Sequence, residues 1–426
     1  MRHLRTCLLC ATLGAGVFAT SASAQDVTLD VLYCNPSFSR FHEPIAEAFM
    51  EQHPEIGINF LAPCANYDEG HQQMLRNAVT NQLPDVYYSG FHLLSELTGR
   101  LAERGQITEL GPLLEEEGEE FINANFDPKL LALGRVDDVQ YGIPFNASSP
   151  IIYFNADLVR QAGGDPENMP SRWDDLVELA ADINELGSDI SGIAYDIHAW
   201  PDDWLWQALI YQQGGALISD DEASVGFNNE LGLNALSISR RLVAEGGMEL
   251  IDRDQSMQQF GAGLTGIYFA TPAQLARVSG LVGERFDLRT AVFPLDNPEE
   301  GGVPTGGNAV IVLSDAPEKQ EAAWKFVTFV TGPEAQSIVV QTAGYLPTNR
   351  RALGEDYLAP FYEANPNFAT APSQIDRSWP WVGYPGGESV RIWRTQRDLI
   401  ASVMRGDLTV EEGLEQIVGE TEALMR

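Results

Sequence analysis

Strand-like and helix-like segments alternate over the first hundred residues, and this order limits the fold more than any other feature of the chain. The predicted order is strand, helix, strand, helix, strand, helix, over Val27–Tyr33, His42–Gln52, Ile58–Ala62, Tyr67–Asn81, Asp85–Ser89 and Leu93–Arg104. Such an order predicts a parallel sheet with helices on both faces, and therefore an α/β fold.

The residues at or just after the carboxyl end of each predicted strand are rich in polar and aromatic side chains. They are Asn35-Pro36-Ser37, Asn66-Tyr67 and Tyr87-Tyr88-Ser89. The carboxyl ends of parallel strands meet at one edge of the sheet, where ligands of open α/β sheets bind. We therefore expect a ligand site at this edge.

The N-terminus has the pattern of a secretory signal peptide. Arg2 and Arg5 precede an apolar run over Cys7–Ala19, and Ala22-Ser23-Ala24 forms a small-residue cleavage site. The run is too short for a bilayer-spanning helix. We therefore expect cleavage after residue 24 and export to the periplasm.

The chain is strongly acidic, with 61 Asp and Glu against 26 Lys and Arg and a formal net charge of −35. An acidic surface of this kind argues against nucleic acid as a partner. Lysine occurs only at Lys129, Lys319 and Lys325. An anionic ligand would therefore most readily meet an arginine, whose planar fork pairs well with phosphate or sulfonate oxygens.

Two cysteines remain beyond the predicted signal peptide, Cys34 and Cys64. Each follows a predicted strand, and an even pair in an oxidising compartment favours a disulfide. Two buried free thiols are the alternative.

The stretch Tyr141–Asn155 (YGIPFNASSPIIYFN) predicts two short apolar strands around a turn of small polar residues. An ordinary hairpin turn is the simple interpretation. The same hydroxyl, amide and backbone groups would also suit a cleft that fixes a polar ligand.

Catalytic and metal-binding motifs are absent from the sequence. There is no Gly-x-Ser-x-Gly elbow, no His-Glu-x-x-His and no phosphate-binding Gly-x-x-x-x-Gly-Lys loop. The histidine spacing suggests no metal site, and we expect no cofactor. Acidic pairs such as Asp202-Asp203 leave a secreted glycan-active hydrolase open as an alternative function. An exported structural or adhesive protein is a further alternative.

Two clusters combine tryptophans with polar turns. One covers residues 198–206 and includes Trp200 and Trp204, and the other covers residues 378–387 and includes Trp379 and Trp381. Flat rings beside hydrogen-bonding groups suit the apolar faces of sugars and polyols. Core packing is the alternative for any single ring.

Several of these motifs together resemble a known family. Pro144–Leu176, the Gly306-Gly307 pair and Ala343–Asn349 (AGYLPTN) are similar to the extracellular solute-binding proteins of carbohydrate-uptake ABC importers. Within that family the chain most resembles the sn-glycerol-3-phosphate-binding branch. The resemblance extends over essentially the whole exported chain.

This resemblance implies a two-lobed, type II periplasmic-binding-protein fold with the ligand in the cleft between the lobes. The lobes would comprise residues 25–138 plus 294–345 and residues 139–293 plus 346–426. Closure of the lobes would bury a sugar, polyol or glycerol phosphate-like solute. A monomer would then deliver the solute to ABC permease subunits in the membrane, and no enzymatic activity is expected.

The resemblance also implies a set of ligand-binding positions. They are Tyr67, Tyr88, Ser148, Trp200, Trp204, Thr271, Gly307 and Tyr345, with either Arg391 or Arg394 as the residue that binds an anion. The aromatic cluster at residues 378–387 adds Trp381 to this set. Two of these depart from the glycerol phosphate branch, because Tyr88 replaces a glutamate and Thr271 replaces a serine. The chemical identity of the ligand is therefore left open at this point.

Overall fold

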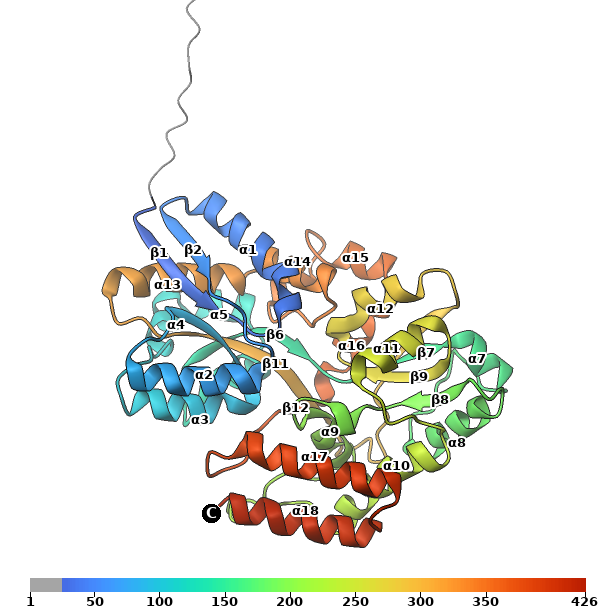
Figure 1. Cartoon of the computed structure of the whole chain (residues 1–426). Helices are drawn as coiled ribbons and strands as arrows, with labels where there is room; N and C mark the ends of the chain where they lie inside the picture. The colour runs from blue at the N-terminus through green and yellow to red at the C-terminus, as the bar shows by residue number, and fades with distance from the viewer. Residues whose placement is uncertain (1–24) are drawn as a thin grey trace, which may run out of the picture.

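The computed structural model describes residues 25–426, and two β-sheets flanked by helices form its framework (Figure 1). The predicted signal peptide, residues 1–24, lies outside the described residues. Among residues 25–426, no helix has both the length and the apolar character needed to cross a membrane.

The first sheet has the strand order β12-β11-β3-β1-β2, and β6 pairs with β11. Its strands are β1 (Val27–Leu32), β2 (Ile56–Phe60), β3 (Val86–Gly90), β6 (Gly142–Ser148), β11 (Val303–Val312) and β12 (Ser378–Pro380). Strand β1 runs parallel to both β2 and β3. The parallel arrangement predicted for the first hundred residues is therefore confirmed.

Helices cover both faces of this sheet (Figure 1). Apolar side chains of α1, α13 and α14 pack on one face, and those of α2 and α3 on the other. The bounds are α1 Ser39–Gln52, α2 Tyr67–Thr80, α3 Phe91–Ala102, α4 Gly111–Glu117, α5 Glu119–Asn125, α13 Pro317–Val330 and α14 Pro333–Thr342. Burial on both faces explains why β3 shows no alternation of apolar and polar residues.

The second sheet has the order β10-β7-β9-β8. Its strands are β7 (Ile151–Asn155), β8 (Ser191–Ala194), β9 (Thr265–Ala270) and β10 (Leu288–Val292). On one face the Trp173 ring stacks on Phe269, with ring centroids 5.3 Å apart, and on the other Phe260 stacks on Tyr268 at 5.4 Å. These aromatic pairs attach the surrounding helices to the sheet.

The helices around the second sheet include the C-terminal pair α17 and α18, which pack against α10. Their bounds are α7 Ala156–Gln161, α8 Trp173–Asn184, α9 Trp204–Tyr211, α10 Glu230–Ala244, α11 Arg253–Ala262, α12 Leu275–Val282, α17 Ser389–Arg405 and α18 Val410–Leu424. Short elements complete the chain: α6 (Pro128–Leu131), α15 (Ala359–Ala364), α16 (Thr370–Ser373) and the small hairpin of β4 (Arg135–Val136) and β5 (Val139–Gln140).

The stretch around Ser149-Pro150 connects the two sheets and is not a hairpin turn. Strand β6 before it pairs with β11 in the first sheet, and β7 after it pairs with β9 and β10 in the second. Strand β6 therefore belongs with the first sheet, although it lies beyond residue 138, where the sequence placed the start of the second lobe. The chain crosses again between β10 and β11.

Candidate functional site

A cavity of about 90 Å³ lies where the two sheets and their connections meet. Both halves of the chain contribute to its wall. The lining residues are Asn35, Phe38, Asn66, Tyr67, Ser148, Trp200, Pro201, Asp202, Trp204, Arg253, Thr271, Gln274, Gly306, Gly307, Tyr345 and Trp381. Eight of the eleven positions predicted from the sequence are among them.

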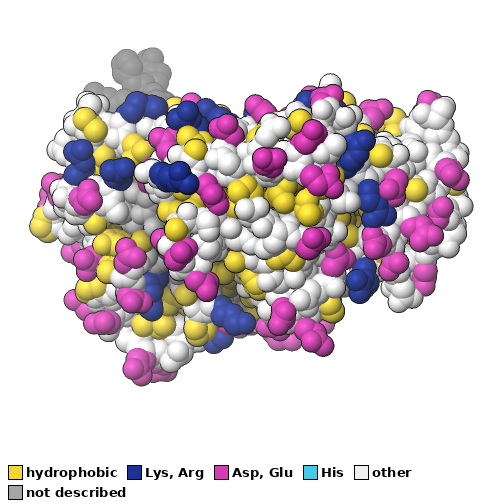
Figure 2. Space-filling model, turned by 90° about the horizontal axis from the view of Figure 1, so that it is seen from below, with side chains coloured by type: hydrophobic (Ala, Val, Ile, Leu, Met, Phe, Trp, Pro, Cys, Tyr) yellow, Lys and Arg dark blue, Asp and Glu magenta, His cyan; other side chains and the backbone are white. Residues whose placement is uncertain are grey.

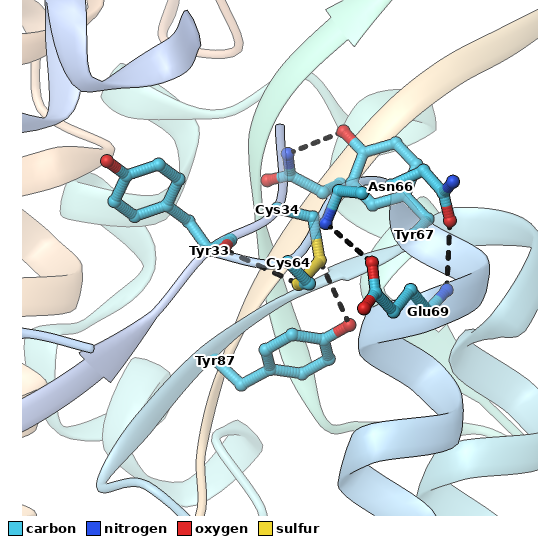
Figure 3. The surroundings of a disulfide bond; sticks show 9 residues. Tyr33, Cys34, Cys64, Asn66, Tyr67, Glu69 and Tyr87 are labelled. Atoms are coloured by element: carbon cyan, nitrogen blue, oxygen red, sulfur yellow. Dashed lines mark hydrogen bonds between the residues drawn. A yellow bond between two sulfur atoms is a disulfide. The ribbon is translucent and has the colours of Figure 1, made fainter. Parts of the chain in front are cut away.

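Tyr67, which lines this cavity, is the first residue of α2. It lies near the disulfide at the edge of the first sheet (Figure 3). The Asn66 side chain caps α2 by accepting a hydrogen bond from the backbone N–H of Glu69 at 2.9 Å. The disulfide between Cys34 and Cys64 joins the segments that follow β1 and β2, so the predicted bridge is confirmed. Capping residue and disulfide together fix the start of α2 at the cavity.

The hydroxyl of Tyr67 faces polar partners across the cavity. Asn308 on β11 donates a hydrogen bond to it at 2.9 Å, and Tyr345 lies beside it. Burial, the largest cause, raises the pKa of Tyr67 to about 12, so the phenol stays protonated at neutral pH. Tyr67 therefore has a hydroxyl proton to donate to a ligand.

Ser148 and the glycine pair face each other on neighbouring strands. Gly306 pairs with Ser148, and Gly307 with Ala147, between β11 and β6. Gly307 has a φ of 122°, and a Cβ at this position would lie 2.2 Å from the Asn146 carbonyl oxygen. Only glycine fits there, because the backbone of Asn146 fills the space that a side chain would need.

Three indole rings form the aromatic part of the wall. Trp200 and Trp204 stack with ring centroids 5.8 Å apart, and the Trp204 Nε1 donates to the Pro304 carbonyl at 3.0 Å. Trp381 donates from Nε1 to the Asp203 carboxylate at 2.9 Å. Each indole is therefore held in place by packing or by a hydrogen bond, with part of its ring in the cavity wall.

One cation and one anion line the cavity among the described residues, Arg253 and Asp202. The Arg253 guanidinium lies over the Trp200 ring, 4.4 Å from its centroid. Burial is the main cause that raises the pKa of Asp202 to about 7, although the residue is half-buried and lines the cavity. The cavity can therefore hold both an anionic group and hydrogen-bond donors.

The Asp202-Asp203 pair does not have the geometry of a glycosidase. Only Asp202 lines the cavity. The Asp203 carboxylate accepts hydrogen bonds from Trp381 and from Gln207 Nε2, both at 2.9 Å. Hydrolysis of a glycoside needs two carboxyl groups facing one bond, and this pair offers one.

Tyr88 does not reach the cavity. It lies within β3, which ends at Gly90 and not at Ser89, and its side chain is 1% exposed. The ring packs against His42 and Phe145, with centroids 4.6 and 4.8 Å away. Alternation along the strand directs Tyr88 toward α1, so it fills the core of the first sheet.

Arg391 and Arg394 are exposed on α17 and do not line the cavity. The helical period places Ile392, Trp393 and Gln396 on the buried side of α17 and both arginines on the outside. The structure thus brings Arg253 to the cavity in place of either predicted arginine.

Thr271 does line the cavity, as predicted. Its hydroxyl oxygen also accepts a hydrogen bond from the Ala273 backbone N–H at 3.2 Å.

Sequence reasoning missed Arg253 and Asp202, and one signal for Arg253 was present. Asp252 and Gln255 form a capping box at the start of α11, which places Arg253 in its first turn. The helix dipole disfavours a cation in the first turn, so an arginine at this position suggests a role other than stabilising the helix. For Asp202, no local pattern separates it from the many other acidic residues of the chain.

A larger groove of about 780 Å³ lies on the other side of Trp381 and His92. It runs between α3, the segment 216–222 and the segment 379–389, and contains none of the predicted ligand-binding residues.

In Figure 2 acidic side chains are spread over the face seen from below and are not gathered into one patch. Within residues 25–426, no three His, Cys, Asp or Glu side chains are grouped to hold a metal ion.

Comparison with known proteins identifies the family. Residues 35–337 match the family model for bacterial extracellular solute-binding proteins.

The chain belongs to this family.

Relatives of known role support the assignment. The sn-glycerol-3-phosphate-binding periplasmic protein UgpB of Escherichia coli is 25% identical over 329 residues, which cover 74% of each chain. The chain is a solute-binding protein of an ABC importer, as the sequence predicted.

Solved structures show the same fold. UgpB of Mycobacterium tuberculosis, in complex with glycerophosphocholine, superposes with a TM-score of 0.81 at 20% identity, covering 93% of this chain and 98% of that one. Maltose-bound MalE3 of T. maritima gives a TM-score of 0.77 at 18% identity and covers 93% and 100%. The predicted type II periplasmic-binding-protein fold is therefore confirmed.

Proposed function

We propose that this solute-binding protein captures a sugar, a polyol or a glycerol phosphate-like solute in the cavity between its lobes. The proposal rests on the composition of the cavity wall. Three indoles, several hydroxyl groups, the carboxyl group of Asp202 and the guanidinium of Arg253 line the cavity. Aromatic faces cover the apolar side of such solutes, and the polar groups bind their hydroxyls. Where the solute carries phosphate or sulfonate, Arg253 is its partner.

The ligands of similar proteins support this class of solute. They are sn-glycerol 3-phosphate, glycerophosphocholine and maltose. All three are small and rich in hydroxyl groups. We propose that Tyr67, Ser148, Thr271, Tyr345, Asp202 and the Gly307 backbone bind the hydroxyls of the solute.

The small cavity points to a closed cleft. Ligand pockets usually measure roughly 300–1,000 Å³, and this cavity measures about 90 Å³. Arg40 on α1 also donates across the cleft to the Ala273 carbonyl at 2.9 Å. We propose that the first lobe extends through β6 to residue 148, and that the lobes part to admit the solute.

We further propose that the protein acts as a monomer in the periplasm and is not an enzyme. The acidic surface, the predicted signal peptide and the presence of one cavity-facing carboxylate all support this view. The closed form would dock on permease subunits of the importer.

Replacing Arg253 by glutamine is expected to weaken binding of anionic solutes about 10- to 100-fold. A hydrogen bond to a charged group contributes about 1.5–3 kcal/mol, and the neutral amide lacks the positive charge. A thermal-shift screen over sugars, polyols and glycerol phosphates selects the solutes, because a tight ligand raises the melting temperature. Calorimetric titration then gives the affinities.

Arg394→Gln is the matched control, because Arg394 is exposed on α17 and should leave every affinity unchanged. If Arg253→Gln weakens neutral and anionic solutes equally, the anion-binding role of Arg253 is wrong. If no solute in the screen stabilises the protein, or if one is steadily turned over, the proposed function itself is wrong.

A further inference from the structure

A group of titratable side chains, three of them buried and one half-buried, spans the interface between the lobes beside the cavity. Asp68 on α2 and His92 on α3 come from the first lobe, and Asp202 and Asp203 come from the segment before α9 in the second. We call these four residues the interlobe cluster. They surround one small internal space, so the closed form brings them together.

His92 lies at the centre of the interlobe cluster. Its Nε2 is 3.8 Å from the Asp68 carboxylate, and its ring stacks on Trp381 at a centroid distance of 3.6 Å. Trp381 is in turn hydrogen-bonded to Asp203. His92 is 7% exposed, and within residues 25–426 neither ring nitrogen has a hydrogen-bond partner.

The closed form brings the carboxyl groups of Asp68, Asp202 and Asp203 together away from bulk water, and this favours the binding of a proton by one of them. Burial, first, and then the neighbouring charges of Asp68 and Asp203 raise the pKa of Asp202 to about 7, while His92 opposes the rise. Burial is also the main cause that raises the pKa of Asp203. In an open cleft, water would solvate the same carboxylates, and their pKa values would return toward ordinary ones.

We propose that closing the lobes takes up about one proton in the interlobe cluster, so that mildly acidic conditions favour the closed, ligand-holding form. This regulation rests on the lobe closure of the proposed function, but not on which solute is bound. Because protonation is more favourable in the closed form, the closed form is favoured at low pH. This preference for the closed form is lost as the pH rises through about 7, the pKa of Asp202.

Other charged groups near His92 do not change the direction of this effect. Tyr67, neutral in this range, lies edge-on to the His92 ring, with ring centroids 6.3 Å apart. One turn along α3, Glu96 pairs with His71 at 3.3 Å within the first lobe. Arg253 shares the cavity wall with Asp202 on the other side of the cluster. The other charges of the surrounding elements lie toward the larger groove or solvent: Arg100 and Glu103 on α3, Glu388 before α17, and Arg391 and Arg394 on α17.

The test measures the ratio of closed to open form in the ligand-free protein with its disulfide intact. Dyes attached to Val79→Cys on α2 and Glu420→Cys on α18, both exposed positions, report the separation of the lobes by single-molecule energy transfer. The closed-to-open ratio is expected to fall about tenfold between pH 6 and pH 8, because one proton is released over this range.

Variants identify the proton site. In the double variant His92→Gln with Asp202→Asn, the closed-to-open ratio should change less than about twofold between pH 6 and pH 8. His71→Gln is the matched control, since His71 is buried but pairs with Glu96 inside one lobe, and it should keep the tenfold change. A wild-type ratio that does not vary with pH, or a double variant that keeps the tenfold change, overturns the proposal.

The same labels separate this proposal from the proposed function. Glycerophosphocholine and maltose do not titrate between pH 6 and pH 8, and they serve as probes of closure. If a probe shifts the lobe distance while pH does not, the proton-linked closure is wrong and the proposed function stands. If neither pH nor any solute of the screen shifts the distance, lobe closure is wrong as well, and both proposals fail.

Discussion

Replacing Cys34 and Cys64 by alanine is expected to lower the free energy of unfolding by about 3–4 kcal/mol. The disulfide closes a loop with a sequence separation of 30 residues, and loss of a link of this size restores that much chain entropy to the unfolded state. Natural domains are stable by only about 5–15 kcal/mol, so the loss is a large share of the total.

The same change should also weaken ligand binding. The disulfide holds the ends of β1 and β2 together (Figure 3), and the neighbouring residues Asn35, Asn66 and Tyr67 line the cavity. Without the link, these side chains lose part of their fixed position, and binding has to restore their order at a cost in entropy. We therefore expect lower affinity even at temperatures where the variant is fully folded.

Urea unfolding of the variant and of reduced and oxidised wild-type protein measures the effect. Reduced wild type should match the variant, and a reductant should not destabilise the variant further. A variant within about 1 kcal/mol of oxidised wild type would contradict the prediction, because the entropic effect of a loop this long is larger.

The first sheet could be predicted from the sequence because its signals are local. Alternating strand and helix patterns fixed β1, α1, β2, α2, β3 and α3 to within a few residues, and the two cysteines after β1 and β2 are indeed linked. Parallel pairing follows from that order alone. The stretch around Ser149-Pro150 was harder, because a link between two sheets and a hairpin turn have the same local sequence.

The errors in the site concern the direction of single side chains. Strand β3 is buried on both faces, so its sequence lacks the polar alternation that would show where Tyr88 points. For the arginines, the resemblance pointed to the region of α17 but did not give the register. A shift of one or two residues along a helix moves a side chain from the buried face to the exposed face. Arg253 comes from a segment that contacts the cavity only through the tertiary fold.

Replacing Trp204 by leucine is expected to weaken ligand binding about 30-fold. The flat indole would cover about 80 Å² of the apolar face of a sugar or polyol, which corresponds to about 2 kcal/mol. Trp204 also donates to the Pro304 carbonyl on β11, and this bond holds α9 against the first sheet. Leucine keeps some apolar contact but provides neither a flat face nor the donor.

Trp206→Leu is the control that separates binding from stability. Trp206 lies two residues further along α9, is 0% exposed, and packs edge-on against Phe227 at 5.3 Å, away from the cavity. Its replacement should lower the unfolding temperature while leaving the affinity within about twofold, since the cavity wall is untouched. Calorimetric titration of the solute selected by the screen, with thermal unfolding of both variants, makes the comparison. Equal affinities for the Trp204 and Trp206 variants would show that the Trp204 ring packs in the core and does not contact the solute.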